Sequence, residues 1–104
     1  LIPNFLHSMS QQIVIHAPDS AKVVTERLVH ENLENKLDSY LRPFVDKEVR
    51  VDVKIELHDD NSYSGVLNVD IVDQRYHFDR ERYVHLDDLI NHLFDKLKEK
   101  LARK

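Results

Sequence analysis

The sequence predicts an α+β domain in which two helices cover one face of a four-stranded sheet, in the order β-α-β-β-β-α. Apolar residues recur with the period of an amphipathic helix in two segments, residues 26–41 and 86–104. Between these segments the period changes to two, as in half-buried strands. A short apolar run near the start of the chain, Ile13-Val14-Ile15, supplies the remaining strand, which is the first in chain order.

The start of the chain divides into an extension and a first strand. Residues 1–8 are expected to be an extension or remnant, because Met9 follows them and the strand-like run Ile13-Val14-Ile15 comes soon after. A single domain is expected over residues 9–104. The whole chain of 104 residues is long enough for one core of two packed layers and too short for two independent cores.

The first helix is predicted over residues 26–41. One face of it carries Val29, Leu33, Leu37 and Tyr40. Ser20 and Thr25 both have the chemistry of an N-cap, and the apolar phase favours Thr25 because Val24 lies nearly opposite this face. Val24 would then form a hydrophobic staple with the residue four positions after Thr25. Pro43 disfavours helical geometry at the residue before it and ends the helix nearby.

Three strands are predicted after the first helix, over residues 49–57 and 67–71 and around Tyr76 and Phe78. Polar residues 58–65 contain the only glycine and predict a hairpin loop. A second turn is expected at Asp73-Gln74. Short connections between successive strands favour an antiparallel meander, with Tyr76 and Phe78 pointing inward.

The last helix is the most periodic segment of the chain. Its apolar stripe consists of Leu86, Leu89, Ile90, Leu93, Leu97 and Leu101. Lys96, Lys100 and Arg103 recur at i, i+4 and i+7 along one flank of this stripe, and Asp95 and Glu99 lie one step further round. Taken alone, the pattern is that of a solvated flank whose lysine stems cover the edges of the core.

Composition limits the classes of function. The chain has 15 Lys and Arg against 19 Asp and Glu, a net charge of −4, so it is no general polyanion binder. A nucleic-acid role would need the positive charge to gather on one surface. The sequence has no Cys, which excludes a disulfide framework and thiolate chemistry. No apolar run approaches the roughly 20 residues that span a bilayer, and we expect a cytoplasmic protein.

Neither an active site nor a metal site is predicted. The single glycine excludes a glycine-rich phosphate loop, and no nucleophile elbow is present. His85, Asp88 and His92 have spacing that could begin a metal site, but a closed site needs a further ligand and supporting partners. We therefore expect no enzyme activity, no cofactor, no bound metal and no small-molecule substrate.

The chain also resembles a known family, the short ribosome hibernation promoting factors and ribosome-associated inhibitors. The likeness covers residues 12–104 and is carried by four features. These are a strand ending near His16, the pair Val24-Thr25, the helix Leu33-Glu34-Asn35-Lys36-Leu37, and the ending Leu89-Ile90-Asn91-His92-Leu93-Phe94-Asp95-Lys96-Leu97. The resemblance implies a fold like that of double-stranded-RNA-binding domains. It also implies a non-enzymatic stress factor that binds the small ribosomal subunit where messenger and transfer RNA pass. Separately, we expect the protein to be a monomer.

In that family, basic side chains on both helices contact ribosomal RNA. Carried over by position, the RNA-binding residues would be Lys36, Arg42, Lys96, Lys100, Arg103 and Lys104. The patch is thinner than in relatives, since Ser39, Glu99 and Ala102 stand where a basic residue is frequent. Two alternatives remain. One is a protein–protein interaction module, such as an inhibitor or immunity-type protein, that uses the acidic hairpin loop and the mixed-charge sheet. The more distant one is a metal-dependent enzyme.

Overall fold

A computed structural model of the chain describes residues 11–44 and 47–103. Residues 1–8, expected to be an extension, lie outside the described residues. The strands are Gln11–His16 (β1), Val49–Leu57 (β2), Tyr63–Ile71 (β3) and Gln74–Tyr83 (β4). The helical segments are Asp19–Ala21 (η1), Lys22–Glu31 (α2), Asn32–Lys36 (η2), Asp38–Leu41 (α3), Arg42–Phe44 (η3) and Leu86–Ala102 (α4). Of these, η1 and η3 are 3-10 turns and η2 is a π-helical turn.

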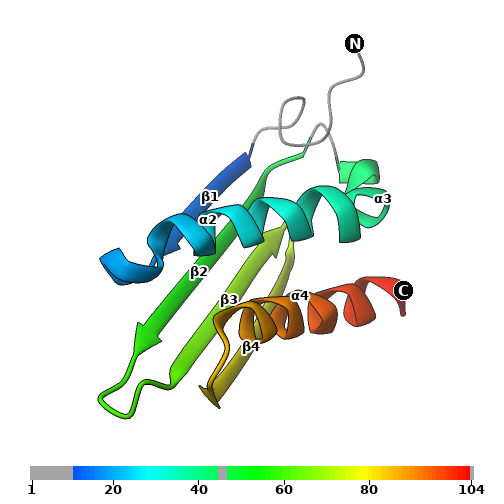
Figure 1. Cartoon of the computed structure of the whole chain (residues 1–104). Coiled ribbons are helices and arrows are strands. Elements are labelled where there is room, and N and C mark those ends of the chain that lie inside the picture. The colour runs from blue at the N-terminus through cyan, green and yellow to red at the C-terminus, as the bar shows by residue number, and fades with distance from the viewer. Residues whose placement is uncertain (1–10, 45–46, 104) are drawn as a thin grey trace.

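The four strands form one sheet in the order β1-β2-β3-β4. β1 pairs with β2 in parallel, and the pairs β2–β3 and β3–β4 are antiparallel. The segment from α2 to α3 and the helix α4 lie across the same face of the sheet and run in the same direction (Figure 1). The predicted α+β class, the element order and the antiparallel meander are confirmed. No helix in the described residues is both long and apolar enough to cross a bilayer.

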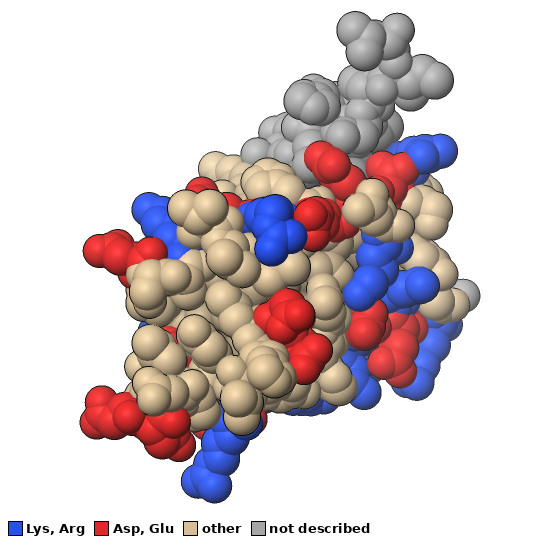
Figure 2. Space-filling view, in the orientation of Figure 1, with Lys and Arg blue, Asp and Glu red and all other residues tan. Residues whose placement is uncertain are grey.

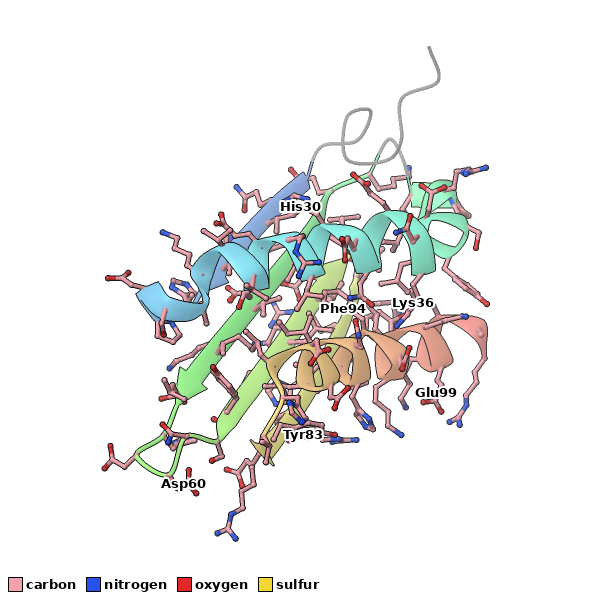
Figure 3. All side chains as sticks on the ribbon, viewed as in Figure 1. His30, Lys36, Asp60, Tyr83, Phe94 and Glu99 are labelled. Carbon is pink, nitrogen blue, oxygen red and sulfur yellow. The ribbon has the colours of Figure 1, made fainter. Side chains whose placement is uncertain are left out.

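The core fills the layer between the sheet and the helices. Inward positions of β2 from Val49 to Ile55, and of β3 from Leu67 to Ile71, are at most 3% exposed. The predicted stripe of α4 is buried apart from Leu86, which is half-buried. Phe94, which the predicted stripe left out, is fully buried as well (Figure 3). It widens the buried face because α4 packs against α2 in addition to the sheet.

The first helix begins earlier than predicted. The turn η1 opens it, with the amide of Ala21 donating to the carbonyl of Pro18 at 2.8 Å, and α2 follows directly. Thr25 is therefore no N-cap: it is fully buried inside the helix, and its hydroxyl has no hydrogen-bond partner among the described residues. The first turn of α2 instead leaves two valines exposed, Val23 at 76% and Val24 at 39%, so the predicted N-cap at Thr25 was wrong.

The middle of the first helix contains a π-helical turn that the sequence did not predict. The amide of Leu37 donates to the carbonyl of Asn32 at 3.1 Å, five residues earlier. A π turn holds more residues than an α turn, so the positions after it rotate backwards relative to an α helix. Leu41 consequently becomes fully buried, whereas Tyr40, which was predicted for the buried face, is only half-buried. Arg42 keeps helical backbone angles although a proline follows it.

Gly65 lies within β3 and not in the hairpin loop, which is shorter than predicted and spans residues 58–62. A Cβ atom at Gly65 would stand 3.0 Å from Cδ1 of Ile55, 3.2 Å from Cδ2 of Leu89 and 3.2 Å from Cδ1 of Leu93. The only glycine is thus explained by the close approach of α4 to the sheet, and not by turn geometry.

The last strand is longer than predicted. The turn before it is formed by Val72 and Asp73, one residue earlier than expected, and β4 runs for 10 residues to Tyr83. Val72 adopts a φ of 56°, which β-branched residues rarely do, so no turn signal marked this position. Tyr76 and Phe78 face the core and are partly buried, as predicted.

Replacing Gly65 with alanine tests the close approach of α4 to the sheet. We expect Gly65→Ala to lower the free energy of unfolding by about 1–3 kcal/mol, because the added methyl group overpacks the contact with α4. Thermal and urea unfolding measure the change. Glu56→Ala, at an exposed position of the neighbouring strand, is the control and should change stability by no more than about 0.5 kcal/mol. Equal stability of Gly65→Ala and the parent chain would contradict this packing.

Candidate nucleic-acid interface

The C-terminal ends of the two helical segments lie at the same end of the molecule (Figure 1). The predicted RNA-contacting residues gather there: Lys36 in η2, Arg42 in η3, Lys96 and Lys100 in α4, and Arg103 directly after α4. Lys104 lies outside the described residues. Helix C-termini carry partial negative charge, so cations are favourable at these positions even without a ligand. Blue and red side chains alternate over this end of the surface (Figure 2).

Lys36 is the most constrained of these cations. Its Nζ atom lies 2.6 Å from Oδ1 of Asp95, so the ion pair joins η2 to α4. The Lys36 side chain is 25% exposed, against 56% for Asp95. Figure 3 shows Lys36 on the side of its helix that faces α4. The sequence placed Asp95 beyond the limit of the basic flank, whereas the structure shows it as the partner of Lys36.

A second cluster surrounds Glu99 on the side of α4 that faces away from α2 (Figure 3). One oxygen of Glu99 lies 3.6 Å from Nζ of Lys96, and the other lies 3.9 Å from Nη2 of Arg103. The sequence predicted Glu99 one step outside the basic line, but its carboxylate lies between two of the cations. Lys100 is exposed and forms no ion pair with another described residue. The cluster keeps an excess of positive charge.

Arg42 forms an ion pair with Asp38, one turn earlier. The Arg42 side chain is 73% exposed and that of Asp38 only 18%. The structure therefore does not join the predicted residues into one continuous stripe. Lys36, Arg42 and the Glu99 cluster are three separate cationic groups at the same end of the two helices.

A groove of about 630 Å³ runs between the two helices. It is lined by Leu28, Glu31, Asn32, Asn35, Lys36, Asn91, Asp95 and Lys98. Lys98 is absent from the predicted set, because the sequence was read along one flank of α4 and Lys98 lies on the flank that faces α2. Only the pairing of two helices could have shown that Lys36 and Lys98 share a groove.

Asn32 and Asn91 connect the walls of this groove. The Nδ2 atom of Asn32 donates to the carbonyl of Leu28 at 2.8 Å and to Oδ1 of Asn91 at 2.9 Å. Asn32 is only 5% exposed, and a buried amide with both donors used is well satisfied. The bond holds η2 and α4 in a fixed relation, so the cations on both helices keep their relative positions.

The cations at this end of the molecule can neutralise anionic groups. Among the described residues, no three His, Cys, Asp or Glu side chains gather closely enough to hold a metal ion. His92, a member of the metal-site alternative, lies against Tyr83 with ring centroids 6.0 Å apart.

A hydrogen bond from the Ser62 hydroxyl at 2.6 Å, with a second from its amide, lowers the pKa of Asp60 in the hairpin turn (Figure 3). That carboxylate stabilises a turn.

Comparison with known proteins gives a fold and no sequence family. No protein-family model matches the chain, and no curated protein matches it either. The Thermus thermophilus Protein Y N-terminal domain matches with a TM-score of 0.58 and 16% identity, over 88% of this chain and 93% of that one. This chain has the fold of the protein Y N-terminal domain. A ribosomal subunit interface protein from Coxiella burnetii matches with a TM-score of 0.50 and 13% identity, over 91% of this chain and 93% of that one.

The family resemblance read from the sequence is thereby confirmed at the level of the fold. Both neighbours are covered almost completely, so the likeness extends over the sheet and over both helical segments. The individual contact residues remain predictions, and Lys98 joins them on structural grounds. From here on, the cationic end denotes Lys36, Arg42, Lys96, Lys98, Lys100 and Arg103.

Proposed function

We propose that the chain is a ribosome-associated translation inhibitor, a hibernation factor that binds the small subunit in the messenger and transfer RNA channel during stress or stationary phase. The observation that carries the proposal is the cationic end, where both helices present Lys and Arg side chains. The fold supports it, because one solved structure with this fold is described as a ribosomal subunit interface protein.

The physical basis of binding is exchange of carboxylate partners for phosphate. Exposed ion pairs stabilise a protein by only about 0–1 kcal/mol. Lys96 and Arg103 therefore lose little free energy when they exchange Glu99 for a phosphate group. Lys98 and Lys100 form no ion pair with described residues, so they can contact phosphate without first losing a carboxylate partner. Each phosphate contact releases condensed counterions, which gives the binding its strength and its dependence on salt. The fixed spacing of the two helices supplies the fit to one RNA surface.

Inhibition by this mechanism requires no reaction. A protein that occupies the channel excludes messenger and transfer RNA by its volume, so we propose a non-enzymatic, cytoplasmic protein that acts as a monomer. The alternative class, a protein–protein interaction module, is favoured by a different surface, the open face of the sheet. That surface is compatible with the proposed function, since it lies on the opposite side of the molecule from the helices.

Charge reversal at the Glu99 cluster tests the proposed function. We expect the chain to co-sediment with purified small subunits at low salt and to be released at high salt. Lys96→Glu, Lys100→Glu and Arg103→Glu together should weaken binding by about 100-fold or more and reduce the salt slope by about 1 for each lost phosphate contact.

The matched control reverses three cations outside this cluster, with Lys22→Glu, Lys54→Glu and Arg75→Glu. It changes the net charge equally and should leave most of the affinity intact. Unfolding curves establish that both variants fold. The proposal is wrong if the parent chain fails to bind small subunits at low ionic strength. The proposed surface is wrong if both triple variants bind alike.

Removal of the central carboxylate gives the opposite prediction. Glu99→Gln releases Lys96 and Arg103 from their ion pairs and keeps the size of the side chain. We expect tighter binding to small subunits, by about threefold to tenfold at low salt, and a salt slope steeper by about 1. Glu26→Gln, an exposed change of the same charge on α2, serves as the control. Weaker binding of Glu99→Gln would show that this carboxylate itself contacts the partner.

A further inference from the structure

The face of the sheet opposite the helices is covered by no described helix. Strand register identifies the charged side chains that point to this open face. The cations are Arg50, Lys54 and Arg75, and the carboxylates are Asp52, Glu56, Asp70 and Asp79. Glu81 lies at the register shift near the end of β4 and joins this group because it lines the same hollow as Glu56 and Asp79. Among the described residues the open face is therefore acidic, in contrast to the cationic end of the helices.

Ion pairs on the open face neutralise most of its cations and leave carboxylates in excess. Arg50 lies 3.4 Å from Asp52 and Arg75 lies 3.5 Å from Asp70, so two of the three cations are already neutralised. Glu56 and Glu81 form no ion pair with another described residue. Within the part of the chain that the structure describes, the only charged partner of Asp79 is His77 at 3.4 Å, which carries charge only when its ring is protonated. The unpaired negative charge is thus concentrated on β2 and β4, toward the hairpin.

The three remaining carboxylates surround a hollow of about 480 Å³. Glu56 lines it from β2, and Asp79, Arg80 and Glu81 line it from β4. The three carboxylates outnumber this one cation, so the lining keeps a negative balance. Between them lies β3, which contributes Ser64 and the half-buried side chain of Val66. The hollow accordingly combines a partly apolar floor with carboxylates on both sides.

We infer that this hollow is a docking site for an extended, lysine- and arginine-rich peptide segment of a partner protein. Asp79 and Glu81 are two residues apart on β4, an interval of about 6.6–6.8 Å in a regular strand. An extended peptide repeats its side chains at the same interval, so alternate basic residues meet successive carboxylates. The methylene stems of lysine or arginine pack on Val66 while their charged ends reach outward to the carboxylates.

The chemistry of the hollow selects this occupant. Phosphate is repelled by Glu56 and Glu81, so nucleic acid is disfavoured here, and the floor between β2 and β4 suits a chain laid along the strands. The inference goes beyond the proposed function and does not depend on it. A basic segment on the open face and RNA on the cationic end could be bound at the same time, because the two surfaces lie on opposite layers of the molecule.

Peptide titration tests the docking site. The probe is a fluorescently labelled peptide in which lysine and alanine alternate, and the readout is anisotropy at low salt with the full chain. Glu56→Gln together with Glu81→Gln should weaken peptide binding by about fivefold, the loss expected for two exposed ion pairs. The control, Glu26→Gln together with Asp87→Asn, removes the same charge from the helical layer and should change affinity less than twofold.

A second measurement locates the peptide. Amide chemical-shift changes on titration should map to β2, β3 and β4 around the hollow. Equal affinities of the parent chain and the Glu56/Glu81 variant, an equal loss in the control variant, or shifts confined to the helices would each overturn the inference. Sedimentation with small subunits remains unchanged for the Glu56/Glu81 variant under the proposed function, so the two proposals fail independently.

Discussion

Helix α4 lies so close to the sheet that a Cβ atom at Gly65 would stand only 3.0–3.2 Å from side-chain atoms of Ile55, Leu89 and Leu93. This contact, together with the fully buried Phe94, fixes the rotation of α4 about its own axis. Once the apolar stripe faces the sheet, one polar flank must face α2 and the other must face solvent. The groove with Lys36 and Lys98, and the cluster around Glu99, both follow from that rotation. The placement of charge is a consequence of core packing.

The result is a molecule with its charges separated by layer. Both helices run in the same direction, so their C-terminal ends come together, and cations are favourable there because of the helix dipoles. The open face of the sheet has the reverse balance, with its unpaired carboxylates near the hairpin. The net charge of −4 therefore does not reveal that one surface of the chain carries mainly cations and another mainly carboxylates. The total charge says little about what either surface can bind.

Periodicity predicted the layers of the fold well, because burial on one face leaves a repeating pattern in the sequence. It failed where local geometry departs from an ideal helix or strand. Burial of Leu41 depends on a π-helical turn, and the inclusion of Gly65 in a strand depends on a helix packed against it. The predicted contact residues on α4 came from their spacing along that helix alone. The ion pair between Lys36 and Asp95, and the place of Lys98 in the groove, require the second helix and could not be read from one segment.

Lysine reactivity measured by mass spectrometry, on the chain alone and bound to small subunits, tests the central claim most directly. The account predicts that Lys96, Lys98 and Lys100 lose reactivity on binding, since their ammonium groups contact phosphate. Lys54, exposed on the open face of the sheet, should keep its reactivity. Protection of Lys54 with no protection of the α4 lysines would place the ribosome on the wrong face and contradict the account.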